Sequence, residues 1–265
     1  MRLQFLGTGG AFTDFRENYH NNAIVHVEGG VVLIDCGGTA VQSLKELGIS
    51  VHDVKGVIIT HLHGDHIGGL EQLLWERYYT GPNGPSFSST KVWTTLGIHL
   101  DIRDILTPCV QEITKSDGKV YNDGYKELVD HQTVDPGWSF LAGGIHFSLR
   151  KTPHVTSDDG LVDKPSFGVL AIDSEEDSFY YTSDTTFRPN VGELFPDVTT
   201  IFHDCVFYPK YPGTVHTHWE ELQLLPPEIQ DKIVLMHHTK VPAGLDLGRF
   251  RAAARHDSFE VIRGQ

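Results

Sequence analysis

The segment His61-Leu62-His63-Gly64-Asp65-His66 constrains this chain more than any other stretch of its sequence. It comes directly after residues 57–60, an apolar run typical of a buried strand. Two imidazoles placed two residues apart can converge on one cation, and the carboxylate and imidazole that follow can face a second. Nitrogen and oxygen donors of this kind suit borderline metals such as Zn²⁺. A histidine-rich polar loop without metal is the alternative, but the position at a strand end favours a two-metal site.

The pattern of apolar residues predicts many strands and a smaller number of helices. Strands are expected at residues 3–6, 23–28, 31–35, 57–60, 145–151, 167–173, 179–182, 200–204 and 233–236. Helices are expected at 41–47, around 70–74, and at 97–106, 219–225 and 249–255. Gly29-Gly30, between two strand patterns, predicts a tight hairpin. Strands first, and then strands mixed with helices, predict an α/β fold: an αββα sandwich of two packed sheets with helices outside.

The length of 265 residues and the hydrophobic content of 39% suit a packed domain and exclude a disordered chain. Residues 78–92 are rich in Pro, Gly and Ser, and 115–127 are polar. The stretch from about 76 to 135 has too few apolar side chains for a core of its own. We therefore expect a single domain over residues 1–265, with an irregular insertion at about 76–135.

Charge and cysteine content narrow the classes of function. The chain has 21 basic against 35 acidic residues, a formal net charge of −14, which argues against binding a long nucleic acid through its phosphates. Its three cysteines are widely spaced and form neither a disulfide framework nor a metal motif. We find no secretory signal and no apolar run near the roughly 20 residues of a membrane helix. We therefore expect a cytoplasmic protein that does not bind a membrane.

The His-x-His-x-Asp-His pattern after a strand resembles the metallo-β-lactamase fold superfamily. The resemblance implies an αββα sandwich of the metallo-β-lactamase type and three later metal ligands, each placed after a strand. His154, Asp184 and His237 stand at such positions. The implied cofactors are two divalent metal ions, with Zn²⁺ favoured and Mn²⁺ as the alternative.

The resemblance also implies how the ligands are divided between the two ions. The first ion would be held by His61, His63 and His154. The second ion would be held by Asp65, His66 and His237. Asp184 would bridge both, because a carboxylate can give one oxygen to each cation. A hydroxide between the ions would be the nucleophile, since the paired charges lower the pKa of a bound water.

Each later ligand has an ordinary alternative. His154 alone suits a surface loop, and Ser183-Asp184-Thr185 alone suits a turn, but the first motif favours metal binding for both. His237 and His238 are adjacent, so only one of them can point inward from the strand end. The strand register favours His237.

Residues 215–222 indicate one branch of the superfamily. The stretch that begins at His216 and ends at Glu221 resembles the H-x-[ST]-x-x-E motif of the phosphodiesterases that include the tRNA 3′-processing endonuclease. In that branch the histidine lies near the leaving group, so the resemblance implies that His216 is a catalytic residue and acts as the general acid. The resemblance also implies a catalytic role for Asp65 of the first motif. His218 stands where the branch has Ser or Thr. A solvent-facing loop histidine is the alternative for His216.

Residues 221–229 and 235–238 resemble the anti-Pycsar-type cyclic-nucleotide phosphodiesterases of phages and their bacterial relatives. The resemblance implies a homodimer that hydrolyses cyclic nucleotides, with 3′,5′-cyclic mononucleotides as the favoured substrates. It also implies a role in evading cyclic-nucleotide immune signalling, and a protein encoded by a phage would act in the cytoplasm of the host. A tRNA 3′-processing endonuclease ranks second, because residues 76–135 lack a basic arm. The third hypothesis is a lactone or thioester hydrolase on the same metal site, which needs no general acid.

The candidate substrate contacts are Asn21, Tyr78 and His218. Asn21 belongs to a polar loop that lies beside the metals in this superfamily, and Tyr78 offers a ring that can stack on a base. Ordinary loop polarity, core packing or dimer packing is the alternative for these residues. Tyr208 and Tyr211 are further candidates for stacking on a base.

Overall fold

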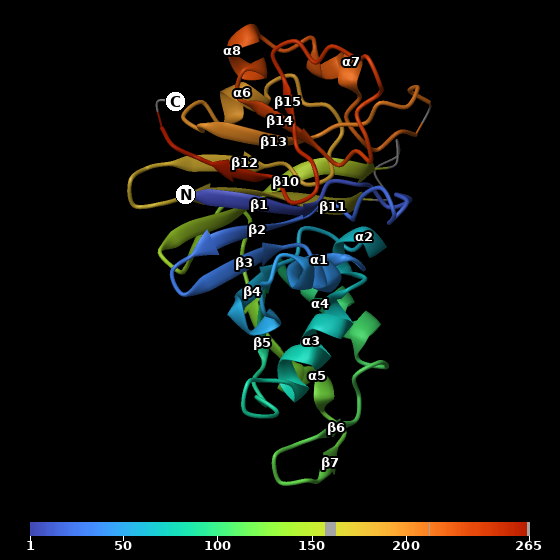
Figure 1. The fold of residues 1–265 in the computed structure, drawn as a ribbon, viewed down its shortest axis with the longest axis vertical. Helices are drawn as coiled ribbons and strands as arrows, with labels where there is room; N and C mark the ends of the chain where they lie inside the picture. Colours follow the sequence, from blue (N-terminus) through green and yellow to red (C-terminus); the bar gives the residue numbers. More distant parts are fainter. Residues whose placement is uncertain (157–162, 212, 264–265) are drawn as a thin grey trace.

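The computed structural model describes residues 1–156, 163–211 and 213–263, and its centre is a pair of sheets packed face to face (Figure 1). The first sheet has seven strands in the order β16-β1-β2-β3-β4-β5-β8. Their bounds are β1 Arg2–Gly7, β2 Asn22–Val27, β3 Gly30–Ile34, β4 Val54–Ile58, β5 Thr90–Thr94, β8 Val129–Thr133 and β16 Ser258–Glu260. The predicted hairpin joins β2 and β3, but its two turn residues are Glu28 and Gly29, because Gly30 already pairs with Val27 as the first residue of β3. Gly29 lies in the left-handed region at φ 75°.

The second sheet also has seven strands, in the order β15-β14-β13-β12-β11-β10-β9. Their bounds are β9 Ser139–Ala142, β10 Ile145–Thr156, β11 Asp163–Ile172, β12 Ser178–Tyr181, β13 Thr200–Asp204, β14 Ile233–Met236 and β15 Arg251–Ala252. Strands β9 to β12 pair antiparallel, whereas β12 to β15 pair parallel. Parallel strands end at the same edge of the sheet, and this edge is where the candidate site lies.

The core between the sheets is rich in aromatic side chains. Phe5 of β1 packs edge-on against Phe202 of β13, with ring centroids 5.5 Å apart, and Phe179 packs against the same ring. All three side chains are fully buried. Replacing a buried aromatic of this kind by alanine costs about 3–5 kcal/mol. The packing holds the two sheets, and therefore their strand ends, in a fixed relation.

Helices cover the outer faces of both sheets, as Figure 1 shows. On the side of the first sheet lie α1 Ala40–Glu46, the 3₁₀ turn η1 Val51–Asp53, α2 Gly64–Ile67 and α3 Leu70–Tyr79. On the side of the second sheet lie α6 Val191–Leu194, α7 Trp219–Leu222 and α8 Pro227–Gln230. Leu222 of α7 packs there with Ile201 and Leu235 in a second apolar cluster. The predicted αββα sandwich is confirmed. Within the part of the chain that the structure describes, no helix is long and apolar enough to cross a membrane.

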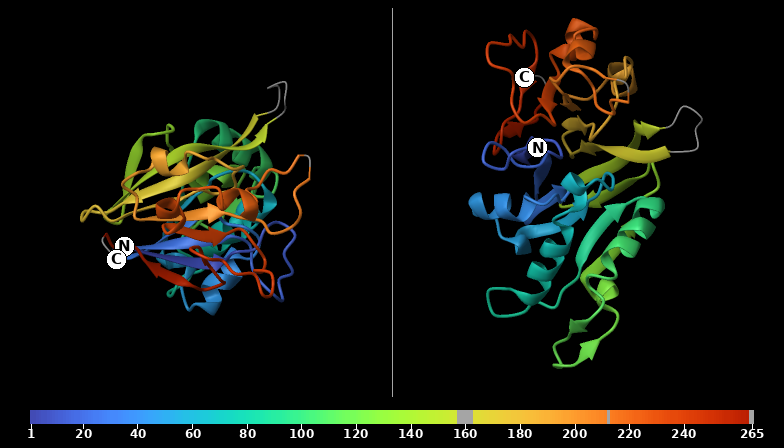
Figure 2. Two further views of the ribbon diagram at one scale, coloured as in Figure 1. Left: turned by 90° about the horizontal axis from the view of Figure 1, so that it is seen from above. Right: turned by 90° about the vertical axis from the view of Figure 1, so that its right-hand side faces the viewer.

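Residues 76–135 contribute more regular structure than the sequence predicted. Strands β5 and β8 continue the first sheet beyond β4. The remainder forms α4 Leu96–Leu106, a small hairpin of β6 Ile113–Thr114 and β7 Val120–Tyr121, and α5 Gly124–Leu128. This part projects from the end of the molecule farthest from α8 (Figures 1 and 2).

Two helix predictions near the C-terminus are corrected by the structure. Residues 249–255 do not form a helix, because Arg251–Ala252 pairs with the open edge of β14 and satisfies backbone groups there. The helix expected at 219–225 ends at Leu222, and a separate short helix begins at Pro227. Proline at the first position of a helix is favourable, because its missing N–H has no partner there in any case.

Candidate metal centre

The candidate site lies at the edge where parallel strands of both sheets end. Strands β3 and β4 run parallel in the first sheet, and β12, β13 and β14 run parallel in the second. The turns after these strands, together with the last part of β10, bring together the seven predicted ligands: His61, His63, Asp65, His66, His154, Asp184 and His237. His63 is half-buried and the other six are buried.

The first group consists of His61, His63, His154 and Asp184, whose donor atoms lie within 4.8 Å of one another. The Nδ1 atom of His63 is 3.1 Å from Nε2 of His61 and 3.2 Å from Nε2 of His154. Oδ2 of Asp184 is 3.5 Å from Nε2 of His61. Three imidazoles and a carboxylate therefore surround one point.

The second group consists of Asp65, His66, His237 and Asp184. Nε2 of His66 is 3.3 Å from Oδ2 of Asp65, and Nε2 of His237 is 3.4 Å from the same oxygen. Oδ1 of Asp184 is 3.2 Å from Nε2 of His66 and 3.3 Å from Nε2 of His237. Two imidazoles and two carboxylates therefore surround a second point.

The carboxylate of Asp184 faces both groups with different oxygens. Its Oδ2 atom faces the first group and its Oδ1 atom faces the second. Oδ1 of Asp184 and Nε2 of His66 are buried and have no hydrogen-bond partner. Buried polar atoms without a partner are costly, so these two atoms suit a ligand that accepts their lone pairs.

The spacing of the donor atoms fits two divalent cations. With Zn–N distances of about 2.0–2.1 Å, the corners of a coordination tetrahedron lie roughly 3.3 Å apart. The donor separations given above run from 3.1 to 3.5 Å. The His and Asp clusters are therefore consistent with a binuclear metal site.

Electrostatics differ between the two groups. Burial lowers the pKa of His154 to about 4, and burial together with neighbouring imidazoles lowers those of His61 and His63. These three rings are therefore neutral at neutral pH, which is the form that binds a metal. Burial opposes charge on His66 and His237 as well, but the surrounding carboxylates raise both pKa values, that of His237 to about 9. The second group thus favours positive charge at its centre.

Asp35 supports the centre and was not predicted from the sequence. Its Oδ2 atom accepts a hydrogen bond of 2.7 Å from Nδ1–H of His66, and its other oxygen accepts one from the backbone N–H of Thr60. A carboxylate behind a histidine ligand fixes the tautomer and leaves Nε2 free to bind a metal. Asp35 follows the end of β3, so its place after a strand was the signal that could have identified it.

The backbone carbonyl of Val215 has the same effect on His154. It accepts a hydrogen bond of 3.0 Å from Nδ1–H of this ring. The Nε2 atom of His154 is therefore the unprotonated one, and it faces the first group.

Asp204 is a second functional candidate that the sequence prediction missed. It ends β13, and its Oδ2 atom accepts hydrogen bonds of 3.0 Å from Nδ1–H of His216 and 2.9 Å from the N–H of Thr185. Its Oδ1 atom lies 3.5 Å from Nδ1 of His237. The pair of Asp204 and His216 therefore stands beside the second group, with 16% of the His216 side chain exposed.

The three predicted substrate contacts lie in unexpected surroundings. Asn21 is fully buried, and its amide donates to the Tyr181 hydroxyl and accepts from the N–H of His237. Tyr78 is 2% exposed and belongs to the core. His218 is 3% exposed and precedes α7, where Glu221 accepts a hydrogen bond from its backbone N–H. Asn21 therefore holds the backbone of a metal-centre residue, and Tyr78 presents no open ring.

An exposed aromatic pair, Tyr208 and Tyr211, lies on the loop that leads to His216. Tyr208 is 42% exposed and Tyr211 is 56% exposed, and their rings stack with centroids 5.9 Å apart. The ring of Tyr208 also packs edge-on against that of His218, with centroids 5.5 Å apart, and burial, Tyr211 and Asp204 raise the pKa of Tyr208 to about 12.

The adjacent histidines after β14 point to different places. His237 adopts a left-handed conformation with φ 63° and joins the second group. His238 packs against Phe207, with ring centroids 5.5 Å apart, and belongs to neither group.

Comparison with known proteins identifies the family to which this chain is similar. Residues 1–252 match the family model described as "Anti-Pycsar protein Apyc1". A protein with that name from Paenibacillus sp. (strain J14) is 32% identical and the alignment covers 98% of this chain and 96% of the relative. Another, from Bacillus phage BSP38, is 31% identical and the alignment covers 89% of this chain and 88% of the relative.

Solved structures share the fold at low sequence identity. The metallo-β-lactamase fold protein YhfI from Bacillus subtilis superposes with a TM-score of 0.73 at 17% identity, over 97% of this chain and 98% of that one. Human tRNase Z, short form, superposes with a TM-score of 0.70 at 15% identity, over 99% of this chain and all (100%) of that one. These likenesses confirm the metallo-β-lactamase fold.

Proposed function

This chain belongs to the family of anti-Pycsar Apyc1 proteins and is a metal-dependent hydrolase, and on that basis we propose that it is a phosphodiesterase of cyclic nucleotides. Its preferred substrates are 3′,5′-cyclic mononucleotides. The family name connects the chain with the degradation of a cyclic-nucleotide immune signal, and its role is the evasion of that signalling.

The observation that supports this proposal best is the position of Asp184 between two ligand groups. A phosphodiester carries one negative charge, and cleavage adds more charge to the attacking and leaving oxygens. Two bound divalent ions, proposed to be Zn²⁺, supply an activated water molecule and neutralise that charge. His61, His63 and His154 would hold one ion, Asp65, His66 and His237 the other, and Asp184 both.

His216 is the proposed general acid, and Asp204 positions it. Asp204 accepts a hydrogen bond from Nδ1–H of His216, so Nε2 is the atom that can pass a proton to a leaving oxygen. Hydrolysis of a cyclic nucleotide breaks one P–O bond, and the ribose oxygen that departs is a poor leaving group unless it receives a proton. A lactone or thioester hydrolase needs no such acid, so the presence of His216 beside the metal centre favours a phosphodiesterase.

Tyr208 and Tyr211 are proposed to contact the nucleobase. Both rings are exposed, they stack on each other, and Tyr208 packs edge-on against His218, two residues after His216. A base that stacks on an aromatic ring gains roughly 1–3 kcal/mol. This contact replaces the one expected of Tyr78.

A small substrate agrees better with the charges of the chain than a tRNA does. Lys115, which follows β6 in the connection of the projecting β6–β7 hairpin, lies 2.6 Å from Glu127 and 3.8 Å from Asp123. Its charge is therefore neutralised locally and adds little to an attraction for phosphates. We keep tRNA 3′ processing as the second hypothesis to be tested.

A homodimer in the cytoplasm is proposed as the working form. Light scattering during size-exclusion chromatography would give a mass of about twice 29.6 kDa if the dimer forms. A mass equal to one chain at micromolar concentration would reject it.

A hydrolysis panel tests the proposed substrate. The purified protein, loaded with Zn²⁺ or Mn²⁺, is given 3′,5′-cyclic purine and pyrimidine mononucleotides, cyclic dinucleotides and pre-tRNA. We expect linear mononucleotides as products of the first class and chelator-sensitive turnover. Cleavage of pre-tRNA alone would overturn the proposal.

A further inference from the structure

The side-chain hydroxyl of Thr60 contacts residues that belong to both ligand groups of the metal centre. Thr60 directly precedes the first metal-binding motif, and its side chain is fully buried. Its Oγ1 atom lies 2.8 Å from Oδ2 of Asp35, 3.1 Å from Nδ1 of His61 and 2.8 Å from Oγ of Ser183. His61 belongs to the first group, whereas Asp35 holds the ring of His66 in the second. One hydroxyl therefore contacts a ligand of one group and the support of a ligand of the other.

The chemistry of the partners fixes the direction of these three hydrogen bonds. A carboxylate oxygen only accepts, so Thr60 donates its single hydroxyl proton to Asp35. The two lone pairs of Oγ1 then accept from the Ser183 hydroxyl and from Nδ1–H of His61. Nε2 of His61 consequently carries no proton, and it faces the first group. Thr60 thereby selects the tautomer of His61 that can bind a metal through Nε2.

The backbone of Thr60 fixes the position of this hydroxyl. The N–H of Thr60 donates to Oδ1 of Asp35 at 2.8 Å, and its carbonyl accepts from the N–H of Phe167 at 3.1 Å. Asp35 follows β3 of the first sheet, and Phe167 belongs to β11 of the second. Thr60 therefore stands where the two sheets meet, so its hydroxyl has a defined place relative to the strand ends of both.

Two of the three partners of the hydroxyl have backbone conformations that L side chains rarely adopt. Asp35 has φ 61° and Ser183 has φ 55°, both in the left-handed region. Such conformations persist only where surrounding contacts hold them, and they gather at functional sites. Ser183 directly precedes Asp184, whose carboxylate faces both ligand groups. The Thr60 hydroxyl thus bonds to the turns that lead to ligands from each sheet.

We propose that Thr60 is a positioning residue whose hydroxyl supports the binding of both metal ions. It orients His61 for the first ion directly, and it orients His66 for the second ion through Asp35. The two sites are therefore linked, because the loss of one hydroxyl loosens a ligand of each ion. This inference rests on the proposed two-metal site.

Stepwise Zn²⁺ affinities, measured by competition with a fluorescent chelator, test the proposal in Thr60→Val and Thr60→Ser. Valine has nearly the shape of threonine but lacks the hydroxyl, so both affinities should fall about 10–100-fold, as expected when a group behind a metal ligand is removed. Serine keeps the hydroxyl and should restore most of the affinity for both ions.

The imidazole of His61 gives a readout other than affinity. In the Zn²⁺-loaded wild type, proton–nitrogen spectra should show a proton on Nδ1 of His61 that exchanges slowly with water, because this atom is bonded to a buried hydroxyl. Exchange should be faster in Thr60→Val and slow again in Thr60→Ser. A wild-type His61 without a proton on Nδ1 would overturn the proposal, even if Thr60→Val does not fold.

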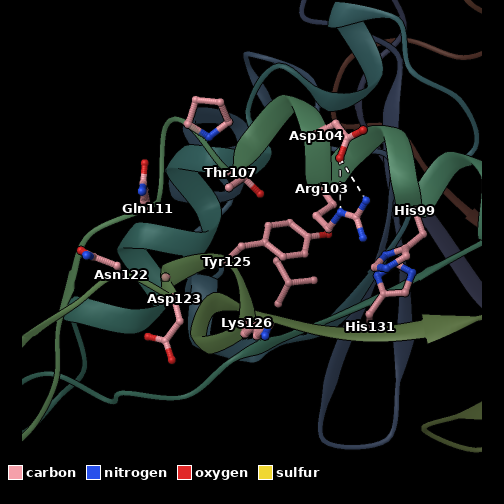
Figure 3. A pocket seen from close by; sticks show the side chains of 13 residues that line it. His99, Arg103, Asp104, Thr107, Gln111, Asn122, Asp123, Tyr125, Lys126 and His131 are labelled. Atoms are coloured by element: carbon pink, nitrogen blue, oxygen red, sulfur yellow. Dashed lines mark hydrogen bonds and ion pairs between the residues drawn. The ribbon is translucent and has the colours of Figure 1, made fainter.

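Two other buried hydroxyls provide the controls. Thr90 is 1% exposed and accepts a hydrogen bond from Nε–H of Arg77. It begins β5, which runs parallel to β4, so Thr90→Val makes the same chemical change at the opposite edge of the sheet. Tyr125 is 8% exposed and lines a cavity of about 750 Å³ between α4, α5 and β8, whose lining residues lie between positions 99 and 131 (Figure 3). Thr90→Val and Tyr125→Phe should both bind Zn²⁺ as the wild type does.

The outcomes that contradict this role are distinct. Wild-type affinities in Thr60→Val would overturn the proposal, and equal losses in Thr60→Ser would do the same, because the methyl group and not the hydroxyl would then matter. Loss of affinity for one ion alone would show that the hydroxyl does not serve both groups. Equal losses in Thr90→Val would assign the effect to general destabilisation. These results leave the metal centre intact, whereas a wild type that binds no Zn²⁺ would overturn the centre and this inference together.

Discussion

Oδ2 of Asp204 lies 3.0 Å from Nδ1 of His216, and Oδ1 of the same carboxylate lies 3.5 Å from Nδ1 of the metal-centre residue His237. One buried carboxylate thus contacts the proposed general acid and a proposed metal ligand. A carboxylate in this position fixes the tautomer of a histidine and stabilises its protonated form. This relationship leads to the first two predictions.

His216→Ala should lower kcat for a 3′,5′-cyclic nucleotide by about 10²–10⁴-fold, the usual contribution of a general acid. It should change kcat for bis(p-nitrophenyl) phosphate far less, because nitrophenolate leaves without a proton. Steady-state kinetics on both substrates measure the difference. Equal losses on the two substrates would contradict the role of His216 as an acid.

Asp204→Asn should lower kcat for the cyclic nucleotide by roughly tenfold or more, because the amide lacks the charge that stabilises a protonated His216. Asp204 acts through His216, so its loss should again spare the aryl ester. Metal content, measured in parallel, should stay at the wild-type value. A variant that loses metal and both activities together would assign Asp204 to metal binding instead.

Asp35→Ala should weaken metal binding about 10–100-fold, as expected when the carboxylate behind a histidine ligand is removed. Its Oδ2 atom is 2.7 Å from Nδ1 of His66, and the variant leaves that ring without a fixed tautomer. Competition with a fluorescent chelator gives the affinity. Asp53→Ala, in a surface capping box, is a control with the same chemical change and should keep full affinity. Unchanged affinity in Asp35→Ala would show that His66 needs no such support.

Tyr208→Ala should raise KM for cyclic nucleotides roughly 5- to 150-fold, the equivalent of about 1–3 kcal/mol of stacking. Tyr208→Phe keeps the ring and should restore most of the affinity. The kcat value should change little in either variant, because the proposed contact is made to the base and not to the bond that breaks. If both variants raise KM equally, the contact is made through the hydroxyl and stacking is excluded, and if neither raises KM, Tyr208 does not contact the substrate.

The clearest predictions from the sequence came from residues whose position after a strand was itself the signal. The His61–His66 motif, Asp184 and His237 follow strands that the apolar pattern identified, and the fold brings them together. His154 joins them from within β10, which runs on past the predicted strand end at residue 151. The αββα architecture followed from the same strands, and the comparisons confirm it.

Other features depended on long-range packing that the local pattern does not contain. Asp35 follows β3 and Asp204 is the last residue of β13, but nothing near them in the sequence identifies His66 or His216, 31 and 12 residues away, as their partners. The sequence suggests that Tyr78 begins a loop, yet it lies in the last turn of α3 and its side chain packs into the core. Residues 251–252 form a strand because β14 offers an open edge, which is a property of the whole sheet.

The metal content of the purified protein tests the central claim most directly. Mass spectrometry of the wild type should find two divalent ions per chain, and Asp184→Ala should lose one or both because its two oxygens face both ligand groups. Activity on cyclic nucleotides should disappear with the metal and return when Zn²⁺ or Mn²⁺ is restored. A fully active protein with one ion or none, or an Asp184→Ala variant that keeps both ions, would contradict the account.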